Sequence, residues 1–180
     1  MPTMKLTHRF TLVVLLGLGA VTGWAAGSAT EKSNARVTVT FSDPEKFADA
    51  ADGQRGSSVR REGNLADIED YIVERATLYL AEGQRLQVTV TDVDLAGEVE
   101  PWRTHGAHDL RIVKDIYPPR IDLSFQLLDA SGAVVKEGER KLKDLTFTWK
   151  ITINQNDPRV HEKALIDDWL RSEFKRGKKQ

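Results

Sequence analysis

The spacing of apolar residues alternates between two values along this chain, and this alternation constrains the fold more than any other feature. Every second residue is apolar in Val37–Phe41, Leu86–Val90 and Ile121–Leu127, which is the pattern of half-buried strands. Steps of three and four residues connect the apolar residues of Leu65–Tyr79 and Ala164–Leu170, which predicts two amphipathic helices. The sequence therefore predicts an α+β fold, a two-layer sandwich with two helices packed on one face of a mostly antiparallel sheet.

Turn and cap residues set the expected boundaries in the first half of the chain. Residues 48–63 contain Val59 as their only large apolar residue, so a loop is expected there. Asn64 is expected to cap the first helix, because its side chain accepts from amides of a first helical turn. Gly83 stands where such a helix commonly stops.

The second half of the chain contains a predicted hairpin. The turn Ala130–Gly132 joins the strand before it to an antiparallel arm over Val134–Leu142. A short strand is expected over Leu110–Val113, and Phe147–Ile153 alternates as a further strand. Asp157 is expected to cap the second helix.

The N-terminal residues have the composition of a secretory signal peptide. Lys5, His8 and Arg9 precede an apolar run over Phe10–Val21, and small residues follow it as far as Ala29. The run is about half of the ~20 apolar residues that a membrane-spanning helix needs. We expect a cleaved signal over residues 1–27, with cleavage between 25 and 30, and an uncleaved N-terminal anchor is the alternative. The expected location is the periplasm of a bacterium.

The rest of the chain is expected to form one domain. Residues 28–35 are assigned to a linker, 36–175 to a single globular domain and 176–180 to a basic tail. A domain of this size buries enough surface to fold without disulfides, and the chain has no cysteine. Loss of Lys5 and Arg9 with the signal leaves 24 basic against 27 acidic residues. This balance argues against nucleic-acid binding, and no second long apolar run predicts a transmembrane segment in the mature chain.

Two segments carry candidate binding residues. Trp102 and Arg103 stand side by side in a predicted loop, and these residue types are favoured at binding hot spots. The alternative is that Trp102 fills the open end of the sheet as a core residue. A second segment places charged residues around two prolines, either as a site for a polar or anionic ligand or as an internally paired turn. Its candidate residues are Lys114, Asp115, Tyr117 and Arg120.

A metal site is the alternative prediction for the segment between these two. Asp92 and Asp94 fit the first and third positions of a calcium loop, but Arg103 replaces the glutamate required at the twelfth. A looser oxygen site for a hard cation stays open. His105 and His108 supply zinc-ligand types, although their spacing of three lacks the helical pattern of a metalloprotease. Solvated turns are the alternative for both pairs.

Common enzyme signatures are absent from the sequence. There is no cysteine nucleophile, no Gly-x-Ser-x-Gly elbow, no P-loop and no dinucleotide fingerprint in the mature chain, so no catalytic residue is assigned. The leading hypothesis is a non-catalytic binding or accessory module of the cell envelope, with an envelope protein or a small polar ligand as partner and no cofactor. One alternative is a divalent-metal-binding protein or metal-dependent enzyme that uses the Asp92–Asp109 loop. Another is a structural module that self-associates through sheet edges, and the sequence leaves the oligomeric state open.

Three motifs carry a resemblance to a known family. They are Asp92–Gly97, Glu100–Arg103 and Arg111–Ile121, with support from Glu137-Gly138 and Leu165–Trp169. Together they resemble a family of secreted Gram-negative bacterial proteins known as domain of unknown function 3016, from about Val37 to Arg171. The resemblance implies an envelope location and a single domain. It implies no substrate, cofactor or catalytic residue.

Overall fold

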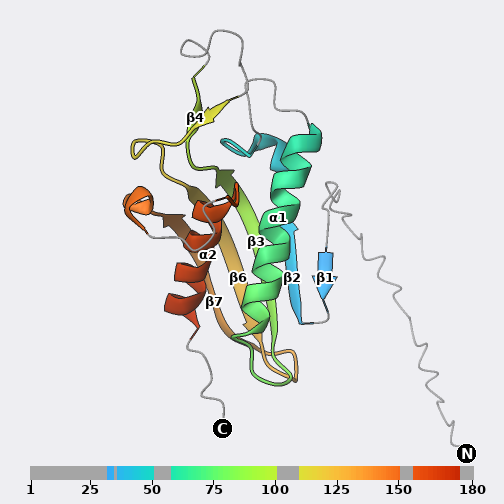
Figure 1. The fold of residues 1–180 in the computed structure, drawn as a ribbon. Coiled ribbons are helices and arrows are strands. Elements are labelled where there is room, and N and C mark those ends of the chain that lie inside the picture. The colour runs from blue at the N-terminus through green and yellow to red at the C-terminus, as the bar shows by residue number, and fades with distance from the viewer. Residues whose placement is uncertain (1–31, 35, 51–57, 101–109, 151–155, 175–180) are drawn as a thin grey trace, which may run out of the picture.

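The computed structural model describes residues 32–34, 36–50, 58–100, 110–150 and 156–174 (Figure 1). A five-stranded sheet has the strand order β1-β2-β3-β6-β7, and β4 and β5 form a separate two-stranded sheet. The strands are β1 (Lys32–Asn34), β2 (Val37–Phe41), β3 (Arg85–Asp94), β4 (Glu98–Val99), β5 (Arg111–Ile112), β6 (Arg120–Leu128) and β7 (Val134–Lys143). The helices are α1 (Ser58–Thr77) and α2 (Val160–Glu173), with short 3-10 turns η1 (Pro44–Lys46) and η2 (Phe147–Trp149).

The sheet is mixed but mostly antiparallel. β2 and β3 are parallel, and α1 forms the connection between them. β1 with β2, β3 with β6, and β6 with β7 are antiparallel pairs. β1 lies within residues 28–35, so the segment assigned to a linker contributes an edge strand.

Both helices cover the same face of the sheet (Figure 1). The alternating apolar residues of β2, β3 and β6 point toward them, and Ile68 and Ile72 of α1 are fully buried on this layer. Trp169 of α2 packs edge-on against Phe125 of β6, with ring centroids 5.9 Å apart. Asp167 joins the helices, since it accepts from Arg75 Nε at 2.8 Å and from the Tyr71 hydroxyl at 3.0 Å. The predicted α+β two-layer arrangement is confirmed.

The first helix begins earlier than the sequence predicts. α1 starts at Ser58, so the loop predicted over 48–63 ends at least six residues too late. Arg60, Arg61 and Glu62 have good helix propensity and extend the helix in the N-terminal direction. Asn64 is therefore inside α1 and is not its cap, and its side chain donates to the Ala50 carbonyl at 3.2 Å.

The strand predicted over Phe147–Ile153 is wrong in its described part. Phe147–Trp149 forms the 3-10 turn η2, in which Phe147 is buried and Trp149 is 85% exposed. The turn is set by Asp144, whose Oδ1 accepts from both the amide and the hydroxyl of Thr146 at 2.9 Å. Residues 151–155 lie outside the described part of the chain. The second helix begins at Val160 with Arg159 at its N-cap, so the prediction that Asp157 caps this helix is wrong. Asp157 Oδ1 instead accepts from the amide of Arg159, in the turn before the helix, at 2.9 Å.

Candidate functional site

The segment that follows β3 is held in place by Arg111 of β5. Arg111 Nη1 donates to the carbonyl oxygens of Leu95 and Gly97, at 3.3 and 2.7 Å, and Nη2 pairs with Asp49 Oδ2 at 2.5 Å. Burial raises the pKa of the Asp49 carboxyl, although its contact with the Arg111 guanidinium acts in the opposite direction. One guanidinium of β5 thus connects the backbone of Leu95 and Gly97 with the side chain of Asp49 near the end of β3.

Two further contacts fix the same segment. The Ala96 amide donates at 2.7 Å to Oε1 of Glu162, a residue of α2 that is only 1% exposed. The Gly97 amide donates to the Tyr117 carbonyl at 3.0 Å. Gly97 has φ +86°, and a Cβ at this position would lie 2.8 Å from the Ile112 carbonyl oxygen. Glycine is therefore required here by both backbone conformation and space.

Glu100 organises the turn that leads from β5 to β6. Its side chain is 3% exposed, forms an ion pair with Lys114 Nζ and accepts from the Tyr117 hydroxyl at 3.1 Å. The Lys114 ammonium also lies 5.8 Å from the centre of the Tyr117 ring. Both residues are thereby directed toward a buried carboxylate, while Asp115 stays exposed on the turn.

A polar pocket of about 270 Å³ opens between these fixed segments, and we call it the end pocket. It is lined by Asp94, Leu95, Gly97, Glu98, Ile116, Tyr117, Pro118, Arg120 and Lys143. Arg120 Nε donates to Asp94 Oδ2 at 2.8 Å, and this bond raises the pKa of the Arg120 guanidinium. Lys143 lies opposite Arg120 in the register of β6 and β7, and no described residue forms an ion pair with it.

The structure brings together part of the predicted binding surface. Tyr117 and Arg120 line the end pocket, Lys114 supports it through Glu100, and Asp115 lies next to its exposed rim residue Ile116. Trp102 and Arg103 lie outside the described residues. Sequence reasoning missed Lys143, which reaches the pocket only through the hairpin register. Counting residues outward from the turn at Ala130–Gly132 would have placed Leu142 opposite Arg120, because the register shifts by one residue between Leu127 and Leu128.

The two carboxylates of the predicted metal site have protein partners. Asp92 Oδ1 accepts from the Ala48 amide at 2.7 Å, and Asp94 pairs with Arg120. His105 and His108 lie outside the described residues. In the parts of the chain that the structure describes, no group of three or more histidine, cysteine, aspartate or glutamate side chains is arranged to hold a metal ion.

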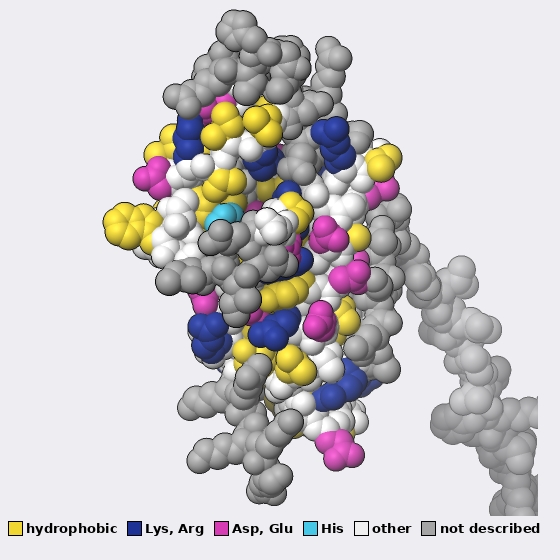
Figure 2. Space-filling model, in the orientation of Figure 1, with side chains coloured by type: hydrophobic (Ala, Val, Ile, Leu, Met, Phe, Trp, Pro, Cys, Tyr) yellow, Lys and Arg dark blue, Asp and Glu magenta, His cyan; other side chains and the backbone are white. Residues whose placement is uncertain are grey.

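For the described residues, the face of the molecule that carries the helices has no separate patch of one charge that would indicate a second binding surface. Acidic and basic side chains of the described residues are interspersed there (Figure 2). Among the described helices, none combines the length and apolar character needed to cross a membrane.

The fold and the end pocket define a small α+β protein with a polar pocket, lined by two acidic and two basic side chains, beside the C-terminal end of its central strand β3. The chain matches the family described as Protein of unknown function (DUF3016) over residues 35–172, and it belongs to this family. The family predicted from the three motifs is thereby confirmed. Neither a curated protein nor a solved structure matches the chain.

Proposed function

We propose that this protein is a non-catalytic binding or accessory module of the bacterial cell envelope, secreted to the periplasm, and that the end pocket is its binding surface. The observation that carries the proposal is the combination of a fixed frame and exposed charge in this pocket. Arg111, Glu100 and Glu162 hold the surrounding backbone, so few groups have to be ordered when a ligand binds.

The chemistry of the pocket favours a small polar ligand that carries an anionic group. Lys143 supplies a cation without a described ion-pair partner, and Arg120 beside it presents a planar guanidinium that suits carboxylate or phosphate. Glu98 and Asp94, the ion-pair partner of Arg120, add acceptors for a donor group of the same ligand. The volume of about 270 Å³ is close to the lower end of the roughly 300–1,000 Å³ typical of ligand pockets.

Native mass spectrometry of the mature protein, purified from its own periplasm without chelator, tests this proposal. A ligand mass in addition to that of one or two polypeptide chains is expected, and Arg120→Ala should remove this ligand mass. Arg120 pairs with Asp94 at the surface, so this variant should lose no more than about 1 kcal/mol of stability. Arg85→Ala is the matched control, because Arg85 is exposed at the opposite end of β3.

A protein partner would leave no extra mass after purification. A photo-crosslinking residue in place of exposed Ile116, at the rim of the end pocket, should then capture this partner in the periplasm, and the same residue in place of Arg85 should not. If Arg120→Ala keeps the bound mass, or if both positions crosslink equally, the end pocket is not the binding surface.

A further inference from the structure

β7 is a long edge strand of the five-stranded sheet. It spans ten residues and pairs with β6 on one side, and no described strand pairs with its other side. An edge strand presents unpaired backbone amides and carbonyls, which makes it a template for another strand. The strand at the opposite edge, β1, has only three residues.

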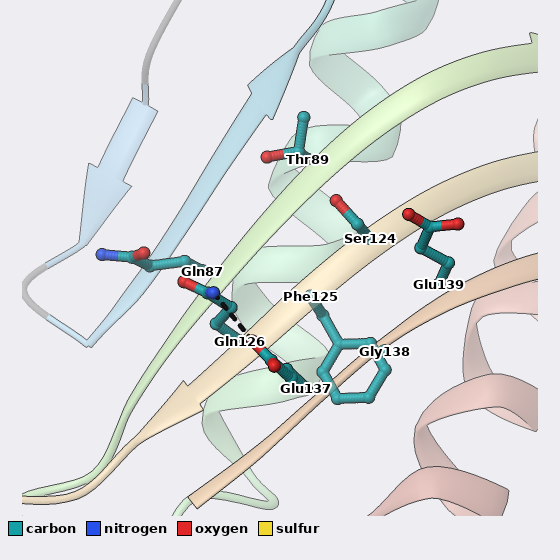
Figure 3. A pocket seen from close by; sticks show the side chains of 8 residues that line it. All are labelled: Gln87, Thr89, Ser124, Phe125, Gln126, Glu137, Gly138 and Glu139. Carbon is teal, nitrogen blue, oxygen red and sulfur yellow. Dashed lines mark hydrogen bonds between the residues drawn. The ribbon is translucent and has the colours of Figure 1, made fainter. Parts of the chain in front are cut away.

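The outer side chains of β7 follow an ordered charge pattern. Glu137, Glu139, Lys141 and Lys143 alternate with inward residues, so two acidic side chains are followed by two basic ones on the same face. This face is the one without helices, where Glu137 and Glu139 lie beside Gln126 and Ser124 of β6 (Figure 3).

We propose that two copies of this chain pair through β7, antiparallel and centred on Arg140, to form one sheet across both copies. In this register Glu139 lies opposite Lys141 of the other copy, and Glu137 lies opposite Lys143. Each of the four charges therefore meets an opposite charge directly across the strands, which stabilises an antiparallel pair. The occupant of the edge is a second copy because the charge pattern is complementary to itself.

Neighbouring registers lack this complementarity. Opposite residues of an antiparallel pair place their side chains on the same face of the sheet. The alternative registers are therefore those that still place outer side chains of one copy opposite outer side chains of the other. A register centred on Glu139 places this carboxylate against its own copy, and a register centred on Lys141 does the same for that ammonium. A register centred on Gly138 places Glu137 against Glu139. Only the register centred on Arg140 pairs all four charges.

The contacts of Arg140 also fit this register. Arg140 would face Arg140 of the other copy, but its charge is already balanced within its own chain. Its Nε and Nη2 contact the Glu173 carboxylate at 2.7 and 2.9 Å.

Exchange of the charges tests the proposal without affecting the core. Lys141 is 89% exposed and Glu139 is exposed, so Glu139→Lys and Lys141→Glu should each fold with an unchanged circular dichroism spectrum. Lys141→Glu should melt at a slightly lower temperature than Glu139→Lys, because it loses the 3.9 Å ion pair with Asp122 and places a carboxylate opposite it. Sedimentation velocity over a wide range of concentrations should show dimers of the unmodified protein. Each single variant should be monomeric, because like charges then face each other twice.

A double variant and a mixture complete the test. The double variant Glu139→Lys with Lys141→Glu should dimerise again, and an equimolar mixture of the two single variants should form a heterodimer. Lys143 lines the end pocket and also faces Glu137 of the other copy, whereas Glu139 and Lys141 do not line the pocket. The two single variants therefore break the dimer without removing a pocket residue, and ligand binding is measured on them as well as on the unmodified protein. An unmodified protein that stays monomeric at all concentrations would overturn the proposal, and so would single variants that dimerise as well as the unmodified protein does.

Discussion

Gly97 shows how closely one residue controls the end pocket. Its φ is +86°, and a Cβ would lie only 2.8 Å from the Ile112 carbonyl oxygen, so there is no room for a side chain. Gly97→Ala should therefore lose at least about 1–3 kcal/mol of unfolding free energy, the usual range for strained backbone. Urea denaturation measures this loss.

A second glycine provides the matched control. Gly63 lies inside α1, and a Cβ there would meet nothing within 4 Å. Gly63→Ala should stabilise the protein by about 0.5–1 kcal/mol, because alanine loses less conformational freedom in a helix. Equal effects of the two substitutions would contradict the role assigned to Gly97.

His161 should make stability depend on pH below neutrality. Burial lowers its pKa from the usual 6.5, and its ring packs edge-on against Phe147 at 4.8 Å. The unfolded chain therefore binds a proton more readily than the folded chain does. The contribution of the neutral imidazole to the stability of the fold is complete above pH 6.5, and it is lost as the pH falls through the lower pKa of the folded state.

The variant His161→Phe isolates this effect, since it keeps an aromatic ring against Phe147 and removes the titration. Its melting temperature should fall less than that of the unmodified protein between about pH 7 and about pH 5. The other titrating groups are common to both proteins and cancel in the comparison. An equal fall of the melting temperature in both proteins over this pH interval would show that His161 does not carry the pH dependence.

At the scale of elements, Glu162 couples α2 to the end of the central strand. Its Oε1 accepts from the buried amide of Ala96, while Oε2 has no hydrogen-bond partner among the described residues. Glu162→Ala should cost about 1–3 kcal/mol, because it leaves the Ala96 amide buried and unpaired. Glu162→Gln retains an acceptor and removes a buried charge, so its cost should stay below that of the alanine variant. Thermal unfolding of both variants measures the difference. If the alanine variant is as stable as the glutamine variant, Glu162 does not couple α2 to the end of β3.

The sequence predicted those elements whose patterns are local. Alternation located β2, β3 and β6, and the Ala130–Gly132 turn predicted the hairpin arm β7, since Asp129 Oδ1 accepts from the amides of Ser131 and Ala133. The strand predicted from Phe147 onward is wrong because the same alternation of apolar residues occurs where Asp144 bends the chain into a turn. The prediction that Asn64 caps the first helix is wrong because a residue suited to capping can also lie inside a helix, where its side chain donates to another carbonyl.

The candidate site was predictable only where its residues are adjacent in the sequence. Tyr117 and Arg120 stand in one motif and were found, whereas Lys143 reaches the end pocket through strand pairing. Arg111 belongs to the same motif as Tyr117, but its role depends on carbonyl oxygens far along the chain. Sequence spacing does not show which carbonyl groups a guanidinium will meet.

At the scale of the whole molecule, the described fold and the family match lie beyond the N-terminal apolar run. The described residues begin at Lys32, and the match to the family begins at residue 35. The apolar run of Phe10–Val21 is thus separate in sequence from every residue of the sheet, the helices and the end pocket. Its removal would leave all described contacts intact.

Processing of this N-terminal run gives a test of the proposed location. We expect the periplasmic fraction to contain a chain shortened at a position between residues 25 and 30, which intact-mass measurement determines directly. Leu15→Arg with Leu16→Arg should leave the precursor uncut, because two charges interrupt the apolar run on which export depends. Arg60→Ala, on the exposed first turn of α1, is the control and should be processed normally. A full-length chain in the membrane fraction would instead identify the run as an uncleaved anchor, which would fix the domain to the membrane by residues that precede its first strand.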